Sequence, residues 1–215
     1  MRYRVILFDL DGTLLDTLQD LGEAVNHALS LRGFPTHPTE AFRRKVGHGI
    51  RNLVTVSLPE EYRCDEPLID ACLSDFRAYY TAHIDSHTRP YPGMTELLGL
   101  LHAQGVKLAI ASNKFQEGTE YLIGRFFPGI RFVAILGNRP GAPLKPDPEI
   151  VQEVLRRSGV SKDDALLVGD SPTDMKTAAN GGIESVAGTW GYRTAEELAG
   201  HRQVRNVQEL RAELL

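Results

Sequence analysis

Cysteine is scarce in this chain of 215 residues, which contains only Cys64 and Cys72. Two cysteines are too few for a disulfide framework, so we expect free thiols in a reducing compartment. Long hydrophobic runs are absent as well, because the N-terminal run from Val5 to Phe8 is interrupted by Asp9. A secretion signal needs a longer run, and a membrane span needs about 20 apolar residues. These absences predict a cytoplasmic protein that does not enter membranes.

Positive charge is not in excess either. The 24 Lys and Arg residues are outnumbered by 28 Asp and Glu residues, which gives a net charge of -4. Such a chain is a poor candidate for binding nucleic acid or anionic membranes, although a local cluster can still bind a small anion. Hydrophobic residues make up 42% and charged residues 24%. These values are typical of a globular domain and exclude a disordered or low-complexity chain.

Most of the chain alternates between short apolar runs and segments with helical spacing. The expected strands are 4–8, 106–112, 132–136, 165–170 and a short one around 183–186. The expected helices are 95–104, 116–126, 148–158 and 173–180. Strands that alternate with helices indicate a parallel sheet whose two faces are covered. We therefore predict an α/β fold with a Rossmann-like parallel sheet core and helices on both faces.

The segment 16–86 breaks this alternation, because it shows helical patterns and no convincing strand. Its expected helical segments carry Leu18, Leu21, Val25 and Leu29, then run from Thr39 to Val46, from Gly49 towards Leu58, and from Leu68 to His83. We predict an all-helical cap domain inserted after the first strand. The α/β core then consists of residues 1–15 and 87–215, and the cap of residues 16–86.

Polar residues follow the strands at the carboxyl edge of the predicted sheet, where ligands bind in open parallel sheets. They are Asp9, Asp11, Ser112, Asn113, Lys145, Asp170 and Asp174. Clustered carboxylates repel one another, so this group is costly unless a cation joins it. Oxygen ligands without His or Cys suit Mg²⁺. Mg²⁺ beside a lysine and a serine suits a phosphoryl group.

These residues carry a resemblance to the haloacid dehalogenase superfamily. The string FDLDGTLLD, residues 8–16, resembles its first motif, and Ser112 with Asn113 resembles the second. Lys145 in LKPDP resembles the third motif, and GDSPTD, residues 169–174, resembles the fourth. Order and spacing fit across nearly the whole chain. The helical insertion is similar to the C1 cap of this superfamily.

Three further strings are similar to the phosphoglycolate phosphatase subfamily. They are VGHG at 46–49, SNK at 112–114 and GTWGY at 188–192. The likeness implies a Mg²⁺-dependent phosphomonoester hydrolase that acts on a small phosphorylated metabolite, with 2-phosphoglycolate as the best candidate. It implies no nucleic-acid or membrane partner, and the oligomeric state stays open.

The resemblance also implies a role for each site residue. Asp9 attacks phosphorus to form an aspartyl-phosphate, and Asp11 protonates the leaving oxygen and then activates water. The Asp9 carboxylate, the Asp11 backbone carbonyl and the Asp170 carboxylate hold Mg²⁺. Asp174 orients this group from outside. The implied phosphate-binding residues are Gly12, Thr13, Ser112, Asn113 and Lys145.

Two alternatives stay open from the sequence, a sugar-phosphate mutase of the same superfamily and a non-catalytic phospho-ligand binding module on this fold. The cap-loop string VGHGIRN differs from the pattern of the mutases. The complete set of Asp9, Asp11, Lys145 and Asp170 argues against a binding module. Dehalogenating relatives lack the second aspartate of the first motif, so the presence of Asp11 argues against dehalogenation.

The segment RRKVGHGIR, residues 43–51, places four cations and His48 around a Gly-x-Gly turn. It lies in an insertion with 7 basic and 11 acidic residues. We interpret this turn as the substrate loop of the cap, the alternative being a solvated basic helix end. Arg51 and His48 are the predicted partners of a substrate carboxylate, with Lys45 behind them.

Overall fold

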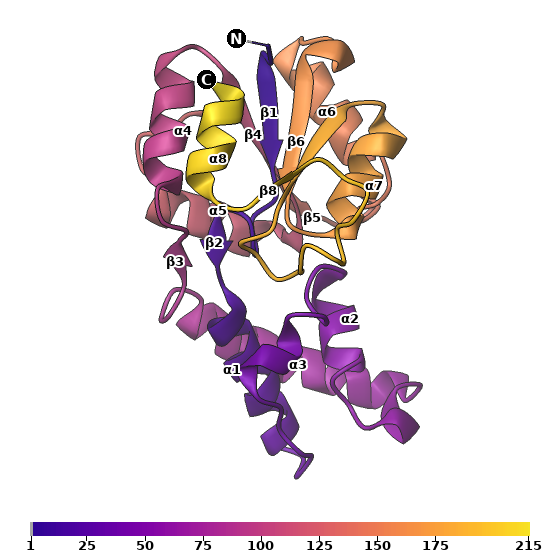
Figure 1. Ribbon diagram of the computed structural model, residues 1–215. Helices are drawn as coiled ribbons and strands as arrows, with labels where there is room; N and C mark the ends of the chain where they lie inside the picture. The colour runs from indigo at the N-terminus through magenta and orange to yellow at the C-terminus, as the bar shows by residue number, and fades with distance from the viewer. Residues whose placement is uncertain (1) are drawn as a thin grey trace.

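The computed structural model describes residues 2–215, which form a sheet region and a helical region stacked end to end (Figure 1). The sheet has the strand order β5-β4-β1-β6-β7-β8, and every neighbouring pair is parallel. Its strands are β1 (Val5–Phe8), β4 (Lys107–Phe115), β5 (Phe132–Asn138), β6 (Ala165–Gly169), β7 (Glu184–Gly188) and β8 (Gln203–Val204). The predicted parallel α/β sheet is confirmed.

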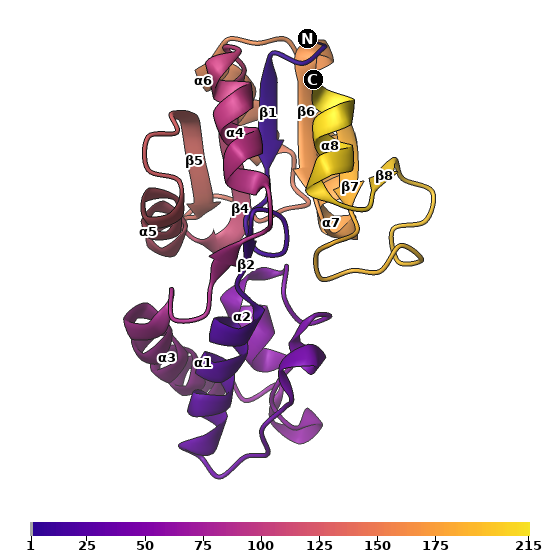
Figure 2. The same cartoon turned by 60° about the vertical axis from the view of Figure 1, so that its left-hand side comes forward.

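Helices cover both faces of the sheet, as Figure 2 shows for α4 and α8 on the near side. The helices of this region are α4 (Met94–Ala103), α5 (Gln116–Phe126), α6 (Glu149–Ser158), α7 (Pro172–Gly181) and α8 (Val207–Leu214). Side chains of β1 alternate between the two faces. Ile6 and Phe8 share a buried cluster with α4, α5 and α8, whereas Val5 and Leu7 share one with α6 and α7.

The helical region lies at the carboxyl ends of the strands, and both chain termini lie at the opposite end of the sheet (Figure 1). It contains α1 (Leu18–Ser30), α2 (Gly49–Thr55) and α3 (Glu66–His83), with the 3-10 helices η1 (Thr39–Phe42) and η2 (Glu60–Tyr62). Its core is continuous with one face of the sheet. None of the helices within residues 2–215 is both long enough and apolar enough to cross a bilayer.

Two short strands connect the helical region to the sheet region. β2 (Leu15–Asp16) and β3 (Arg89–Pro90) are antiparallel, with Leu15 opposite Pro90 and Asp16 opposite Arg89. The expectation that no strand occurs within residues 16–86 is therefore wrong at Asp16. Two residues are too few to show the alternation by which a strand is found in a sequence.

Other differences from the expected elements have similar causes. The helix predicted at 39–46 is only the short η1, after which the chain turns towards Gly47, whose φ is +118°. β4 continues to Phe115, beyond its predicted end at 112, because it runs on through polar residues that end the apolar pattern. β8 and α8 were not expected.

Candidate active site

The candidate active site lies at the carboxyl edge of the sheet, between the sheet and the helical region. Asp9 follows β1, and Asp170 follows β6, which is the neighbour of β1. Ser112 lies near the end of β4, on the other side of β1. Lys145 comes from the loop between β5 and α6. These four residues are all buried, and the strand order explains why distant parts of the chain meet here.

Lys145 links two of the carboxylates. Its Nζ lies 2.9 Å from Asp9 Oδ1 and 2.6 Å from Asp174 Oδ1. Burial lowers the pKa of Lys145, but Asp174 and Asp9 outweigh that effect and raise the pKa above its usual value. The ammonium group is therefore charged and offsets part of the negative charge of the site.

One oxygen of Asp9 is poorly satisfied. Within residues 2–215, Asp9 Oδ1 is the buried side-chain oxygen that accepts no well-aligned hydrogen bond, although Lys145 Nζ lies 2.9 Å away. Burial raises the pKa of the Asp9 carboxyl to about 7, against the effect of Lys145. An orphaned, buried carboxylate oxygen of this kind indicates a place for an attacking atom or a metal ligand.

Carboxylate oxygens of Asp9, Asp170 and Asp174 lie within 4.8 Å of one another. Burial, followed by the charges of Asp174 and Asp9, raises the pKa of Asp170 to about 8. Such a group is unfavourable when ionised, and a hard divalent cation stabilises it. The donor set, which is oxygen only, together with the orphaned Asp9 oxygen, fits Mg²⁺.

Asp170 and Asp174 are each held by the chain around them. Asp170 accepts hydrogen bonds from the Thr13 hydroxyl at 3.1 Å and from the Tyr192 amide at 2.7 Å. Asp174 and Ser171 form the capping box that begins α7, in which the Ser171 amide and hydroxyl both donate to Asp174 Oδ2. Asp174 is thus oriented by its helix start and by Lys145.

The backbone donors expected for phosphate are engaged elsewhere. The amides of Gly12 and Thr13 donate to carbonyls of their own turn, and the Thr13 hydroxyl donates to Asp170. The amides of Leu10 and Asp11 make no such bond within residues 2–215. Gly12 has a different importance, because its φ is +85° and a Cβ there would lie 2.4 Å from Asp170 Oδ2.

Asp11 has two donors beside it. The Thr17 hydroxyl donates to Asp11 Oδ1 at 2.7 Å, and Lys114 Nζ lies 3.1 Å from the same oxygen. Lys114 Nζ also donates to the Tyr80 phenol oxygen at 2.6 Å. Sequence reasoning did not assign Lys114 to the site, although it directly follows the second motif and that position could have pointed to it.

Ser112 and Asn113, the second motif, behave differently. The Ser112 hydroxyl oxygen accepts from the Lys114 amide at 3.2 Å, so its own proton is available to a ligand. The Asn113 side chain exchanges two hydrogen bonds with the Lys145 backbone and donates to the Gly47 carbonyl at 2.9 Å. Asn113 therefore positions the Lys145 loop and contacts the helical region instead of presenting its amide to the pocket.

A small pocket of about 30 Å³ lies between these residues and the helical region. Its lining residues are Asp9, Asp11, Leu21, Val46, Gly47, Gly49, Ile50, Leu53, Ser112, Asn113, Lys114 and Lys145. Both glycines of the Gly-x-Gly turn thus line the pocket. The polar groups come almost entirely from the sheet region, and the apolar ones come from the helical region.

The predicted cations of the turn do not reach this pocket. Arg51 is half exposed and pairs with Glu66 and with Asp70 of α3, the latter at 2.5 Å. His48 is exposed, and Lys45 lies over the ring of Phe42, 5.5 Å from its centroid. The partners of Arg51 lie on another helix, which the order of residues in this segment does not reveal.

Basic residues near the turn join the two regions instead. Arg43 donates to the Gly191 carbonyl at 2.9 Å, and Arg193 donates to the Val46 carbonyl at 2.9 Å. The loop 188–193 is also tied to the first motif by Trp190, whose indole N–H donates to the Thr13 carbonyl at 3.1 Å.

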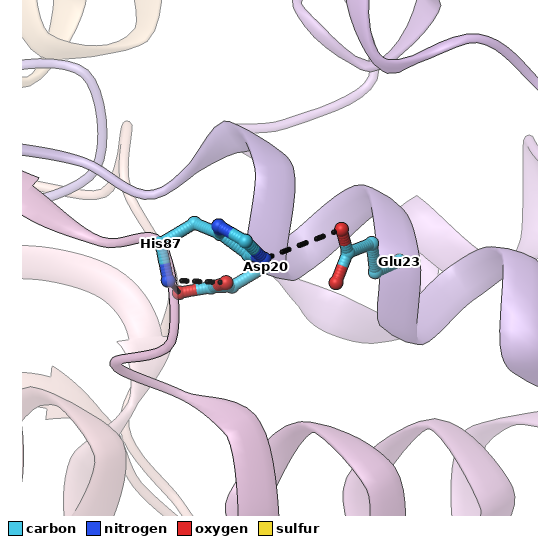
Figure 3. Close-up of side chains that lie close together, drawn as sticks. All are labelled: Asp20, Glu23 and His87. Carbon is cyan, nitrogen blue, oxygen red and sulfur yellow. Dashed lines mark hydrogen bonds and ion pairs between the residues drawn. The ribbon is translucent and has the colours of Figure 1, made fainter.

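A second carboxylate group lies near β3, in the connection back to the sheet, and consists of Asp20, Glu23 and His87 (Figure 3). Buried Asp20 accepts hydrogen bonds from the amides of His87 and Thr88, both at 2.9 Å, and from the Thr88 hydroxyl at 2.7 Å. Its oxygens are satisfied by the chain, so this group fastens α1 to the returning segment. It is not a second metal site on this geometry.

The fold and the site define a hydrolase of the haloacid dehalogenase type. The family model "haloacid dehalogenase-like hydrolase" matches residues 6–188, and the chain belongs to this family. The match includes all four motif segments and the whole helical insertion.

Two curated relatives are both described as phosphoglycolate phosphatases. The phosphoglycolate phosphatase of Mesorhizobium japonicum is 39% identical over 189 residues, which cover 87% of this chain and 83% of that protein. Phosphoglycolate phosphatase 1 of Pseudomonas aeruginosa is 34% identical over 213 residues, which cover 97% of this chain and 77% of that protein.

Solved structures share the complete architecture. A protein from Lactobacillus delbrueckii subsp. bulgaricus superimposes with a TM-score of 0.91 at 30% identity, covering 100% of this chain and 99% of that chain. A predicted phosphoglycolate phosphatase from Haemophilus somnus superimposes with a TM-score of 0.88 at 26% identity, covering 99% of both chains. The sheet and the helical insertion thus keep this arrangement in experimental structures.

Proposed function

We propose that this chain is a Mg²⁺-dependent phosphatase that hydrolyses 2-phosphoglycolate through an aspartyl-phosphate. The observation that carries the proposal is the Asp9 carboxylate, whose buried oxygen lacks a hydrogen-bond partner and lies 2.9 Å from Lys145 at the pocket. An attacking oxygen must be unencumbered, and a cation beside it offsets the charge that it shares with phosphate. The names of the curated relatives support the choice of substrate.

The reaction has two steps. In the first, an Asp9 oxygen bonds to phosphorus, the bond from phosphorus to the ester oxygen breaks, and Asp11 gives that oxygen its proton. In the second, water attacks the same phosphorus, Asp11 takes a proton from that water, and the bond from phosphorus to Asp9 breaks. Phosphate and glycolate leave, and both aspartates return to their starting states.

Asp9 and Asp170, with the Asp11 backbone carbonyl, are the residues that would hold Mg²⁺. When bound, the cation offsets the charge of the carboxylates and of the phosphoryl group. Asp174 keeps Lys145 and the start of α7 in place beside them.

Four groups of the sheet region bind the phosphoryl oxygens in this proposal. The Ser112 hydroxyl and the Lys145 ammonium face the pocket, and the amides of Leu10 and Asp11 supply further donors. The phosphate-binding roles implied by the sequence are not proposed for Gly12, Thr13 and Asn113, because their donors are engaged within the protein.

We assign the α/β core to residues 1–15 and 87–215 and the substrate-selecting cap to residues 16–86. A pocket of about 30 Å³ holds only a few water molecules. In this proposal the cap moves away from the core to admit the substrate. Closure afterwards excludes bulk water during the first step.

Phosphate release from a panel of phosphomonoesters, measured with Mg²⁺, tests the proposal. We expect the highest kcat/KM for 2-phosphoglycolate over 3-phosphoglycerate, ethanolamine phosphate and p-nitrophenyl phosphate.

Asp9→Asn and Asp9→Ala should keep the circular-dichroism spectrum and lose turnover, since no neighbour can replace the attacking carboxylate. Near wild-type activity in Asp9→Asn contradicts the covalent route. Interconversion of sugar-phosphate isomers identifies a mutase, and absence of phosphate release from every ester identifies a binding module.

A further inference from the structure

Two lysines of the sheet region reach the pocket, and they have different surroundings. Lys145 lies between Asp9 and Asp174, at the position of the phosphoryl group. Lys114 is equally buried, with a side chain that is 1% exposed, and lies beside Asp11. Lys145 has a role in the proposed chemistry, and Lys114 does not yet have one.

The hydrogen bonds of Lys114 leave it able to bind a further group. An ammonium has three N–H donors. Lys114 directs one N–H to the Asp11 carboxylate, whose oxygens share it at 3.1 and 3.4 Å, and another to the Tyr80 oxygen at 2.6 Å. One donor is then available to a ligand in the pocket that Lys114 lines.

Asp11 defines which part of the substrate comes near Lys114. A proton donor must lie within hydrogen-bond reach of the ester oxygen that leaves. The leaving group therefore lies on the Asp11 side of the pocket, away from Lys145. Lys114 Nζ is 3.1 Å from Asp11, so it adjoins the same part of the substrate.

We propose that Lys114 binds the carboxylate of the leaving group and thereby selects an acidic phosphomonoester. This inference rests on the proposed function, because it takes Asp11 as the proton donor and phosphoglycolate as the substrate. A second anion in a buried pocket is stable only with a cation beside it.

No other cation is placed to do this. Lys114 and Lys145 are the only Lys or Arg residues that line the pocket within residues 2–215. Arg51 pairs with acidic residues of α3, and Arg43 donates to the Gly191 carbonyl.

The helical side of the pocket offers a carboxylate no charged or polar side chain. It consists of the aliphatic side chains Leu21, Val46, Ile50 and Leu53, together with two glycines. Tyr80, a fully buried residue of α3, holds Lys114 from the same side. The cap thus shapes the leaving-group region and orients the cation, and the charge itself comes from β4.

Lys114→Met tests the inference with two substrates that differ in one group. They are 2-phosphoglycolate and ethylene glycol monophosphate, which has a hydroxymethyl group in place of the carboxylate. We expect the ratio of their kcat/KM values to fall about 10- to 100-fold in the variant, the usual worth of a hydrogen bond to a charged group. If Lys114 acts only by positioning Asp11, both substrates lose equally and the inference is overturned.

Arg51→Met is the matched control, because it removes a cation of the cap that lies outside the pocket. The ratio of its kcat/KM values for the two substrates should stay at the wild-type value.

Calorimetric titration adds a readout that does not need turnover. Lys114→Met should bind 3-phosphonopropionate about 10- to 100-fold more weakly than wild type, and propylphosphonate unchanged; equal weakening for both overturns the inference. Wild-type protein that is inactive on 2-phosphoglycolate but active on other esters overturns the proposed substrate first, and this inference with it.

Discussion

Individual charges decide what the site can do. Four carboxylates and two ammonium groups meet at the carboxyl edge of the sheet, namely Asp9, Asp11, Asp170, Asp174, Lys114 and Lys145. When all are ionised, two negative charges remain in excess, which one divalent cation neutralises. The two lysines divide the group, since Lys145 lies with Asp9 and Asp174, and Lys114 lies with Asp11. The attacking carboxylate and the proton donor are therefore each balanced by a different lysine.

Replacing Asp11 by Asn removes the proton donor and leaves the attacking carboxylate intact. Proton transfer contributes about 10²- to 10⁴-fold, so turnover of an alkyl phosphate should fall by this factor. An aryl phosphate needs little protonation, so its first step should continue while hydrolysis of the aspartyl-phosphate slows. Stopped-flow absorbance with p-nitrophenyl phosphate should show a burst followed by slow turnover. Equal slowing of both steps would count against the acid and base role of Asp11.

Asp170→Ala removes one anionic ligand from the proposed metal site. Because Mg²⁺ relies on few protein ligands, we expect the Mg²⁺ concentration for half-maximal activity to rise at least about 10-fold. Phosphatase assays over a Mg²⁺ titration measure this change. Glu153→Ala, which alters a carboxylate paired with Arg139 on the surface of α6, is the control and should leave the titration unchanged. The same curve for Asp170→Ala and wild type would refute the assignment.

The sequence indicated the residues of the sheet edge better than those of the cap. Asp9 and Asp170 directly follow strands, so sheet topology brings them together whatever the details of the loops. The partners of Arg51 lie 15 and 19 residues away on another helix, and Lys114 meets Asp11 across 103 residues of chain. Ion pairs of this kind depend on how helices and strands pack, and they cannot be predicted from the spacing of residues within one segment.

At the scale of elements, long periodic segments were predicted well and very short ones were missed. α1 buries Leu18, Leu21, Val25 and Leu29, the four residues that formed the expected apolar face. β2, β3 and β8 have two residues each, so only their neighbours in space define them. A strand of two residues that is defined only by its neighbours in space shows no hydrophobic periodicity in the sequence.

The contact between α1 and the returning segment depends on Asp20. Asp20→Ala leaves the amides of His87 and Thr88 and the Thr88 hydroxyl without their buried acceptor (Figure 3). We expect the free energy of unfolding to fall by about 2–4 kcal/mol, as measured by urea denaturation. Glu23→Ala is the control, because Glu23 is partly exposed and its 3.6 Å approach to His87 contributes about 0.5 kcal/mol or less. Equal losses in the two variants would show that Asp20 does not hold this connection.

For the whole molecule, the site makes stability depend on pH and on metal. Burial raises the pKa of Asp9 to about 7 and that of Asp170 to about 8, from the ordinary value of 3.8. The metal-free folded chain therefore binds more protons than the unfolded chain between about pH 4 and pH 8. Its stability should decrease as the pH rises through this window, because the folded state resists ionisation.

Mg²⁺ should reverse this trend, since it binds the ionised carboxylates. At 100 times its Kd, we expect Mg²⁺ to raise the Tm by about 5–10 °C at pH 8 and by less at pH 6. Scanning calorimetry in EDTA and in Mg²⁺ measures both values. Asp170→Asn is the control and should reduce the pH dependence of the metal-free Tm. A metal-free Tm that rises steadily from pH 5 to pH 8 would contradict this account.

The pairing of β2 with β3 has a consequence for how such proteins diversify. Leu15 lies opposite Pro90 and Asp16 opposite Arg89, so the chain leaves the sheet region and returns to it at neighbouring points, about 5 Å apart. A segment whose two ends are that close can be lengthened, shortened or exchanged without shifting any strand of the sheet. The insertion can therefore be exchanged without rebuilding the sheet, provided that the replacement restores the acceptor for the returning chain and the contacts with Asn113 and Lys114 of β4.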